Sequence, residues 1–391
     1  MKFAWSWSWL LCAALAALAA AVSARTQGVA DEEIVLGTIQ DLSGSLAAQG
    51  KQVRLGMQLR LDEANAQGGV HGRKLVLRVE DSAYDPKRAV LAAQKLVQHD
   101  RIFAMVGHLG SANNMAAMPV QFEKNVANFL PVAPAREMVE PAHRLKLGLL
   151  VSSHDQVRQG LPRLIADRGS RSVCAVFQDD EFGLDALRGA HAALAALDMP
   201  MAESTSYKRG ATDFSTQVAR LKARGCDLIV LATGPRETVA VMAESTKTGF
   251  APTFMTTVAA YHENVPKLGG AAVNGLYATM VWPIPYLDDE SPAVREWAGR
   301  FKQRFGESAE MAAIVGYVAM DVFVRAATRA GRELSTDSLI AAMDGLVVAP
   351  DRFGGPELSW SPNKRLGSDA SRLSKLVDGR WKVVSSYAQA R

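Results

Sequence analysis

Apolar and polar residues alternate in blocks along the first third of the chain, and the blocks switch between strand and helix periodicity. Short apolar runs predict buried strands, and longer segments with an apolar residue every three or four positions predict helices. One helix stops at Gly68-Gly69, and another begins with Asp85 as cap and Pro86 in its first turn. Here we expect strands at 33–39, 74–81, 102–107 and 127–133, and helices at 50–69, 85–98 and 115–125.

The same alternation starts again after Ser152. This second series predicts strands at 172–177, 203–207, 226–233, 253–257 and 274–281, and helices at 182–197, 213–224 and 236–249. Two successive series of this kind predict an α/β fold with two doubly wound, Rossmann-like lobes. The last third is mixed, with helices expected at 293–306, 311–331 and 336–346 and a β region that turns at Asp378-Gly379.

The first residues form a segment of different character. Lys2 is the only charge before Arg25, residues 10–22 are an apolar run, and Val22-Ser23-Ala24 has the small-x-small form of a cleavage site. These features predict a secretory signal peptide over residues 1–24. Its removal from 391 residues leaves 367, a length that suggests two domains.

Cysteine positions bear on the compartment and on cross-links. Cys12 could suggest a lipoprotein, but Leu11 stands before it where a small residue is expected. Cys174 and Cys226 remain after cleavage, each at or near the start of an apolar strand. In an oxidising compartment they form a disulfide if those strands are neighbours; the alternative is two buried free thiols.

Charge and motifs give little support to nucleic-acid binding or to catalysis. The net charge of +4 is spread along the chain without a basic block, which argues against a nucleic-acid partner. The segment 44–52 resembles a phosphate loop but has six positions between its glycines, and Gln52 stands where a Ser or Thr is needed. The histidines are scattered, so we expect no metal site and no cofactor.

One acidic cluster leaves two interpretations open. Asp179, Asp180 and Glu181 stand together at the start of a predicted helix. Paired carboxylates can perform acid–base catalysis, whereas carboxylates at a helix start cap free amides and complement the helix dipole. Capping is the favoured interpretation.

Binding is better supported than catalysis. Ligands of open α/β sheets lie outside the carboxyl ends of the strands. Here those ends are rich in Ser, Thr, Gly and Ala, a composition that suits a carboxylate or another oxygen-rich group. Ser111, at the start of the helix after "GHLG", is the strongest single candidate; its alternative role is to cap its own helix.

Several segments in the same order resemble a known family. The leader, "DLSGSLAAQG", "DEANAQGGVHGRKL", "DSAYDPKRAV", "VGHLGS" and "FQDDEFG" resemble the periplasmic binding proteins of the branched-chain amino acid and amide type, from about Glu32 to the C-terminus. The resemblance implies the type I fold, in which three crossovers join two lobes that close like a hinge. The implied crossings are 150–153, 280–283 and 347–353, with lobe one at 32–150 and 283–348 and lobe two at 151–282 and 349–391.

The resemblance also implies site residues. Ser111 and Ala133 match positions that bind the ligand carboxylate, Phe182 matches an aromatic residue that packs on the ligand, and Gln49 lies in the first corner. Trp282 falls at the second crossing, although a core tryptophan is the alternative. The expected ligand-binding residues are Gln49, Ser111, Ala112, Ala133, Ala135, Phe182, Thr233 and Val258.

Three departures from the family pattern bear on the ligand. The corner at 132–136 lacks a hydroxyl, no residue of 256–260 is acidic where amino-acid binders place a glutamate, and Tyr84 and Gly110 replace a cysteine pair. A buried ammonium without a carboxylate is costly, so we expect an apolar or aromatic carboxylate, or an amide, as ligand. Arg136 could meet an acid directly; a surface pair with Glu137 or Glu140 is the favoured alternative.

The expected function is therefore solute capture in the periplasm for an inner-membrane ABC permease. The resemblance implies a monomer that closes on a small-molecule ligand and performs no chemistry on it. Three alternatives remain open at this point: a sensor that docks on a membrane receptor, a true amino-acid binder, and a secreted enzyme that uses Asp179–Glu181.

Overall fold

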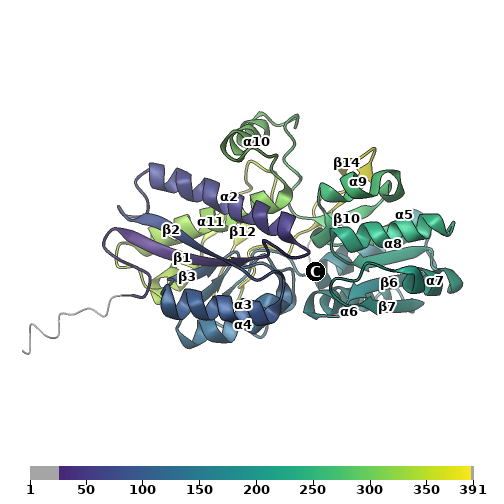
Figure 1. Ribbon diagram of the computed structural model, residues 1–391, viewed down its shortest axis with the longest axis horizontal. Coiled ribbons are helices and arrows are strands. Elements are labelled where there is room, and N and C mark those ends of the chain that lie inside the picture. Colours follow the sequence, from purple (N-terminus) through teal and green to yellow (C-terminus); the bar gives the residue numbers. More distant parts are fainter. Residues whose placement is uncertain (1–25, 389–391) are drawn as a thin grey trace, which may run out of the picture.

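The computed structural model describes residues 26–388, which form two α/β halves side by side (Figure 1). The expected signal peptide and Cys12 lie outside the described residues. The first half is built on a sheet with strand order β2-β1-β3-β4-β5, all parallel. Its strands are β1 (Glu33–Gln40), β2 (Lys74–Asp81), β3 (Ala104–Val106), β4 (Ala127–Phe129) and β5 (Lys146–Leu147).

The second half is built on a sheet with strand order β14-β13-β10-β9-β8-β6-β7. Only the two C-terminal strands run antiparallel to their neighbours. The strands are β6 (Val173–Gln178), β7 (Glu203–Tyr207), β8 (Leu228–Ala232), β9 (Thr253–Thr256), β10 (Tyr277–Met280), β13 (Arg372–Val377) and β14 (Arg380–Val383). A short antiparallel pair stands apart, β11 (Val347–Val348) with β12 (Leu358–Ser359).

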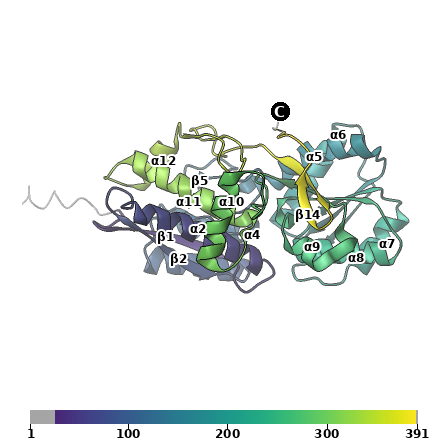
Figure 2. The same cartoon turned by 90° about the horizontal axis from the view of Figure 1, so that it is seen from above.

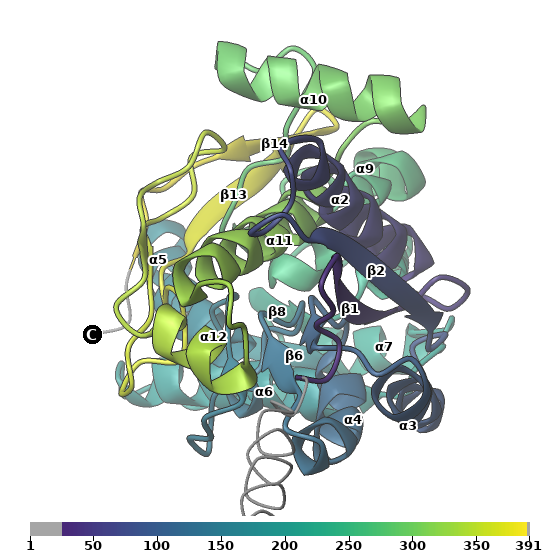
Figure 3. The same ribbon diagram turned by 90° about the vertical axis from the view of Figure 1, so that its left-hand side faces the viewer.

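Helices cover both faces of each sheet, so the predicted doubly wound α/β fold is confirmed (Figure 3). In the first half, α2 and α11 lie on one face and α3 and α4 on the other; in the second, α5 and α6 lie opposite α7, α8 and α9. The long helices are α2 (Ala47–Ala66), α4 (Ser111–Glu123), α5 (Ser153–Arg168), α6 (Glu181–Ala195), α8 (Pro235–Lys247), α10 (Pro292–Phe305) and α11 (Met311–Ala330). The shorter ones are α3 (Pro86–Gln94), η1 (Lys95–His99), η2 (Arg136–Met138), α7 (Ser215–Ala223), η3 (Val258–Ala260), α9 (Asn264–Gly269), η4 (Gly270–Val273) and α12 (Thr336–Met343).

Strand β8 shows how a short apolar run of the sequence forms a buried parallel strand. All five of its residues are buried, and successive side chains point to opposite faces of the sheet. Leu228 and Val230 pack against α5 and α6, whereas Ile229 and Leu231 pack on the side of α7 and α8. A strand covered on both faces needs a continuous apolar run, which is the pattern seen at 228–232.

Two glycines allow α2 and α11 to lie in close contact. A Cβ at Gly56 would stand 1.9 Å from the Ala313 carbonyl oxygen, and one at Gly316 would stand 2.1 Å from that of Val53. Among the described residues, α11 is the one helix long and apolar enough to cross a membrane by length and composition, but 78% of that window is buried inside the protein. It is thus a core helix of the first half (Figure 3).

The chain passes between the halves three times. The first passage leads from β5 into α5, where the Ser153 amide donates to the Pro134 carbonyl over 2.6 Å. The second leads from β10 to α10, and there the buried Trp282 indole N–H donates to an Asp351 carboxylate oxygen over 2.8 Å. Trp282 is therefore both a core residue and part of a crossing segment.

The third passage precedes β13, and residues before it contact the first half. Trp360 donates its indole N–H to the Gly148 carbonyl, and the Gly367 amide donates to the same oxygen. Arg365 forms an ion pair with Asp344. These contacts hold residues 358–367 against the first half, whereas the following strand β13 belongs to the sheet of the second half (Figure 2).

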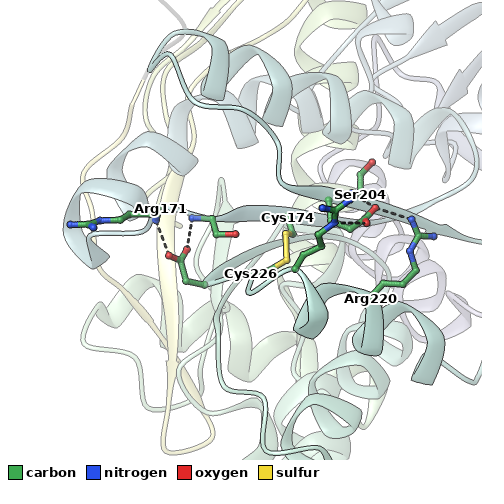
Figure 4. The surroundings of a disulfide bond; sticks show 9 residues. Arg171, Cys174, Ser204, Arg220 and Cys226 are labelled. Atoms are coloured by element: carbon green, nitrogen blue, oxygen red, sulfur yellow. Dashed lines mark hydrogen bonds and ion pairs between the residues drawn. A yellow bond between two sulfur atoms is a disulfide. The ribbon is translucent and has the colours of Figure 1, made fainter.

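A disulfide joins two neighbouring strands of the second half. Cys174 lies in β6 and Cys226 lies just before β8, and these parallel strands pair directly. Their Cα atoms are 5.9 Å apart, within the usual range for a bridge (Figure 4). Of the two possibilities that the sequence leaves open, the structure contains the disulfide.

We expect this disulfide to contribute about 2–4 kcal/mol to the stability of the second half, because it closes a loop of 52 residues in the unfolded chain. The double variant Cys174→Ala, Cys226→Ala should unfold at a lower urea concentration than the wild type. A wild-type sample unfolded in reducing agent should match the variant. Equal midpoints for oxidised wild type and variant would contradict this expectation.

Candidate functional site

A cavity lies between the two halves, at the carboxyl edges of both sheets. One wall comes from the first half, including the N-terminal ends of α2, α4 and α11, and the other from α6, α8 and η3 of the second half. The lining is mostly apolar. The lining residues are Ser45, Leu46, Gln49, Tyr84, Leu109, Gly110, Ser111, Val132, Pro134, Leu150, Gln178, Phe182, Gly234, Glu237, Val258, Ala259, Met311, Ala312 and Val315.

Ser111 lies at the first turn of α4 and lines this cavity. It is only 2% exposed, and its hydroxyl has no hydrogen-bond partner among residues 26–388. The cap position belongs to Gly110, and no side chain caps this helix, so the alternative role of Ser111 as a helix cap does not apply. A buried, unpaired hydroxyl at the positive end of a helix is suited to bind an anionic oxygen.

Three more of the expected residues line the cavity. Gln49 extends from the first turn of α2, Phe182 from the first turn of α6, and Val258 from η3. The Val258 amide donates to the Gln156 side chain over 2.9 Å, so only its apolar side chain is available to a ligand. Gln156 also accepts from the Thr279 hydroxyl and thereby fixes this wall.

Four of the expected residues do not line the cavity. Ala133 packs against Met118 and Met138, and its carbonyl accepts from the Ala135 amide. The Thr233 hydroxyl bonds to Thr238 over 2.6 Å. Ala112 is buried next to Ser111 in the first turn of α4, and Ala135 is buried directly before η2. The structure therefore brings together Gln49, Ser111, Phe182 and Val258 from the expected set.

The first corner is held by a buried aspartate. The Asp41 carboxylate accepts from the backbone amides of Ser43, Gly44 and Leu46. A Cβ at Gly50 would stand 2.0 Å from the Asp41 carbonyl oxygen, so the helix start lies directly on the strand end. This arrangement, and not a phosphate, explains the glycine-rich "DLSGSLAAQG" segment and places Gln49 at the cavity.

Tyr84 is a cavity residue that sequence reasoning placed only as a replacement for a cysteine. Its ring lies against Gly110, where a Cβ would stand 2.9 Å from the nearest ring carbon. The two positions that replace the family's cysteine pair are therefore adjacent in space. Burial raises the pKa of Tyr84 to about 12, so its hydroxyl stays neutral and can act as a hydrogen-bond donor at neutral pH.

The cavity wall contains a carboxylate that the sequence analysis did not include. Glu237, the third residue of α8, lines the cavity and is only 6% exposed. Burial raises the pKa of its carboxyl above the ordinary value. The sequence contains this residue in the segment "ATGPRE". The sequence pattern alone does not show that a side chain in this first helical turn points into the cavity.

The acidic cluster at 179–181 is structural. Asp180 caps α6 by accepting from the amides of Phe182 and Gly183. It also forms an ion pair with Arg209, and Asp179 pairs with Lys208. These contacts confirm the capping interpretation. No group of His, Cys, Asp or Glu suited to a metal ion occurs in the described part of the chain.

Arg209 connects the halves beside the cavity. Its guanidinium donates to the Tyr84 carbonyl over 2.7 Å and lies 4.4 Å from the centre of the Tyr84 ring. A second, more exposed connection joins Arg188 of α6 to Glu137 of η2 over 2.9 Å. Arg136, in contrast, pairs with Glu140 on the surface and does not line the cavity. This agrees with the surface ion pair that the sequence analysis favoured.

Comparison with known proteins adds an independent line of evidence. A family model described as "Periplasmic binding protein" matches residues 33–380. The Leu/Ile/Val-binding protein of Citrobacter freundii is 26% identical over 262 residues, which cover 67% of this chain and 70% of that relative.

Solved structures agree on the fold. A fatty acid ABC transporter substrate-binding protein from Thermomonospora curvata matches with a TM-score of 0.84 and 21% identity, covering 93% of this chain and 94% of its own. A solute-binding protein of an ABC transporter from Rhodopseudomonas palustris BisB5, in complex with 3,4-dihydroxybenzoic acid, matches with a TM-score of 0.79 and 20% identity, covering 91% and 97%. At this identity the likeness establishes the fold.

We expect Ser111→Ala to weaken binding of an acidic ligand by tenfold or more without lowering stability, because the hydroxyl has no partner inside the protein. Isothermal titration and thermal unfolding measure the two effects. Ser245→Ala is a matched control, since Ser245 is also buried with an unpaired hydroxyl but does not line the cavity. Equal affinity for wild type and Ser111→Ala would contradict the assignment.

Proposed function

Because this chain belongs to the periplasmic binding protein family, we propose that it captures a small acid with an apolar body between its halves and delivers it unchanged to an inner-membrane ABC importer. The observation that carries the proposal is the buried, unpaired Ser111 hydroxyl at the start of α4, inside a cavity that both halves line. An acid group bound there meets the positive end of the helix and its free first-turn amides.

The apolar lining supports the second part of this ligand description. Phe182 and Val258 contribute from the second half, and Met311 and Val315 contribute from α11 of the first half. Ligand pockets of this kind combine an apolar body with a few polar groups that fix orientation. An aliphatic or aromatic carboxylate fits that combination.

Closure of the halves on the ligand is the proposed binding step. We place the division between the halves at the crossings 148–153, 281–285 and 368–371, where the chain passes from one sheet to the other. A ligand that contacts both halves favours the closed arrangement, because only there does it make all its contacts. The Arg209–Tyr84 contact belongs to this closed arrangement.

The location and assembly state follow from the same proposal. Residues 1–24 act as a cleaved signal peptide that directs the chain to the periplasm. The mature protein acts as a monomer, without nucleic acid or cofactor, and its partners are a small molecule and the permease. It performs no chemistry on the ligand, because Asp179 and Asp180 are engaged by Lys208 and Arg209.

A ligand panel on mature protein, Arg25–Arg391, tests this function. The panel contains 4-methylpentanoate, 3-phenylpropanoate, benzoate, L-leucine, L-phenylalanine, acetamide and urea. Ligand at about 100 times its dissociation constant should add roughly 2.7 kcal/mol, a rise of a few degrees in melting temperature. At least one carboxylate should produce this shift and be recovered unchanged by mass spectrometry. Absence of a shift with every acid, or recovery of an altered molecule, would contradict the proposal.

Delivery is tested with an ABC permease and ATPase pair of the same organism, chosen because their genes lie beside the gene for this chain where such a pair occurs, and reconstituted in liposomes. Liganded protein should stimulate ATP hydrolysis by that permease, whereas a sensor would leave it unchanged and dock on another membrane protein.

Arg209→Gln should weaken ligand binding by about tenfold and reduce ligand-induced compaction, because it removes a partly buried contact made across the closed halves. Titration calorimetry and small-angle X-ray scattering measure the two effects. Arg188→Gln is the control, since its contact to Glu137 is half-exposed and is expected to change affinity by less than about fivefold. Identical compaction in wild type and Arg209→Gln would refute a role for Arg209 in closure.

A further inference from the structure

Gln156 is a buried polar residue in the first turn of α5, the helix that follows the first crossing. It is 0% exposed and does not belong to the lining of the cavity. Its side-chain Nε2 atom donates to the Val151 carbonyl over 2.8 Å. Its Oε1 atom accepts from the Thr279 hydroxyl over 2.7 Å and from the Val258 amide over 2.9 Å. Gln156 therefore holds three segments that lie far apart in the chain.

The partners themselves decide which way this side-chain amide points. The carbonyl oxygen of Val151 can only accept a hydrogen bond, so it faces the NH2 end of the side chain. The backbone N–H of Val258 can only donate, so it faces the side-chain oxygen. Position 156 thus needs a donor and an acceptor at the end of one side chain.

Each of the three partners occupies a place that bears on closure. Val151 lies in the first crossing, and Thr279 lies in β10, two residues before the second crossing begins at 281. Val258 belongs to η3 and lines the cavity. The Gln156 side chain thus connects the wall that a ligand would touch with two of the places where the chain passes between the halves.

A second glutamine of the same helix holds the third crossing. The Gln159 Nε2 atom donates to the Asp369 carbonyl over 2.9 Å, and its Oε1 atom accepts from the Ser371 hydroxyl over 2.7 Å. Residues 368–371 lead into β13. Since residues three apart are neighbours on a helix surface, both glutamines project from adjacent places on α5. Helix α5 therefore contacts all three crossings through two side-chain amides.

The other buried contacts of α5 are apolar. Val157, Leu161 and Leu164 pack in a cluster with residues of β6, β8 and β9. A Cβ at Gly160 would stand 2.8 Å from the terminal methyl group of Met255, so the helix lies directly on the sheet. Apolar contacts have no preferred direction, whereas hydrogen bonds require a defined distance and angle. An apolar residue at 156 could fill the same space, but it would not fix the wall relative to the crossings.

We propose that Gln156 is a positioning residue for ligand binding: it acts through Val258 and keeps the cavity wall in a fixed place relative to the first two crossings, while Gln159 fixes the third. This inference rests on the proposed function, because it requires that the halves close on a ligand, and it names the residues that couple the cavity to the hinge. Ligand contact at Val258 passes through the Gln156 amide to the segments that turn during closure. Without this amide, the same ligand contact favours the closed arrangement less.

Gln156→Met tests the coupling, because methionine keeps the length of the side chain and removes both donor and acceptor. The probes are 4-methylpentanoate, 3-phenylpropanoate and benzoate, titrated by calorimetry into mature protein at a temperature where circular dichroism shows each variant to be folded. Every acid that binds the wild type should bind Gln156→Met about 2- to 30-fold more weakly, the range for residues that couple a site to a moving element. Equal affinities would overturn the proposal while leaving the proposed function intact.

Gln27→Met is the matched control. Gln27 also bonds to two backbone groups, the carbonyls of Val97 and Ile102, but these belong to the first half and do not line the cavity. The control should change affinity by less than about twofold. A loss in Gln27→Met as large as that in Gln156→Met would mean that any lost hydrogen bond weakens binding, and this would overturn the proposal.

Gln156→Glu separates positioning from a purely structural role. The protonated carboxyl of this variant offers the same donor and acceptor as the amide, whereas its ionised form has no donor for the Val151 carbonyl. Burial raises the pKa of such a carboxyl, so the protonated form is populated at about pH 5. Relative to wild type at the same pH, affinity should be within about threefold at pH 5 and lower by about tenfold at pH 8. A pH-dependent melting temperature with a constant affinity ratio would show a structural role only and would overturn the proposal.

A third measurement needs no ligand. Amide hydrogen exchange of the unliganded protein reports local opening segment by segment. Gln156→Met should speed exchange about tenfold at 149–152 and 280–283 as well as at 257–260, whereas Gln159→Met should do so at 368–372 alone. Faster exchange confined to 257–260 in Gln156→Met would show that wall and crossings are uncoupled, which would overturn the proposal. Failure of all three acids to bind the wild type would contradict the proposed acid-binding function, and the exchange result would still decide the coupling.

Discussion

Both sheets of this protein are covered by helices on each face, and this constraint decides where polar chemistry can occur. Strands such as β8 are buried completely, so they carry no group that a ligand could reach. The backbone becomes accessible only where a strand ends and the next helix has not yet closed its hydrogen bonds. Ser111, Phe182 and Glu237 all lie at such positions, one turn or less into a helix.

The cavity combines the edges of two sheets in one candidate site. Neither half encloses the cavity by itself, since Ser111 and Met311 belong to one side and Phe182 and Val258 to the other. Arg209 joins them by donating to the Tyr84 carbonyl while Asp180 neutralises its charge. Asp180 thus has two roles, because the carboxylate that caps α6 also orients the cation that spans the halves.

Stability and recognition oppose each other at two residues of this cavity. The Ser111 hydroxyl and the Glu237 carboxylate are both buried and lack partners from other residues in the described part of the chain. The buried Asp41 carboxylate, in contrast, accepts hydrogen bonds from three backbone amides. A buried group without a partner costs stability, and at a cavity wall a ligand can supply the missing partner.

The sequence by itself determined most strands, most helices, the two-lobed α/β architecture and the place of Ser111 near a helix start, because periodicity and helix-boundary residues act over a few neighbouring positions. It missed α5, whose interior Pro162 obscures the helical pattern, and it assigned Ala133 and Ala135 to a wall that Pro134 forms. Only the tertiary structure decided that Glu237 lines the cavity, that Arg209 reaches Tyr84 over 125 positions, and that residues 358–367 contact the first half. Those outcomes depend on how the two halves meet, and contacts between distant segments leave no periodic trace in the chain.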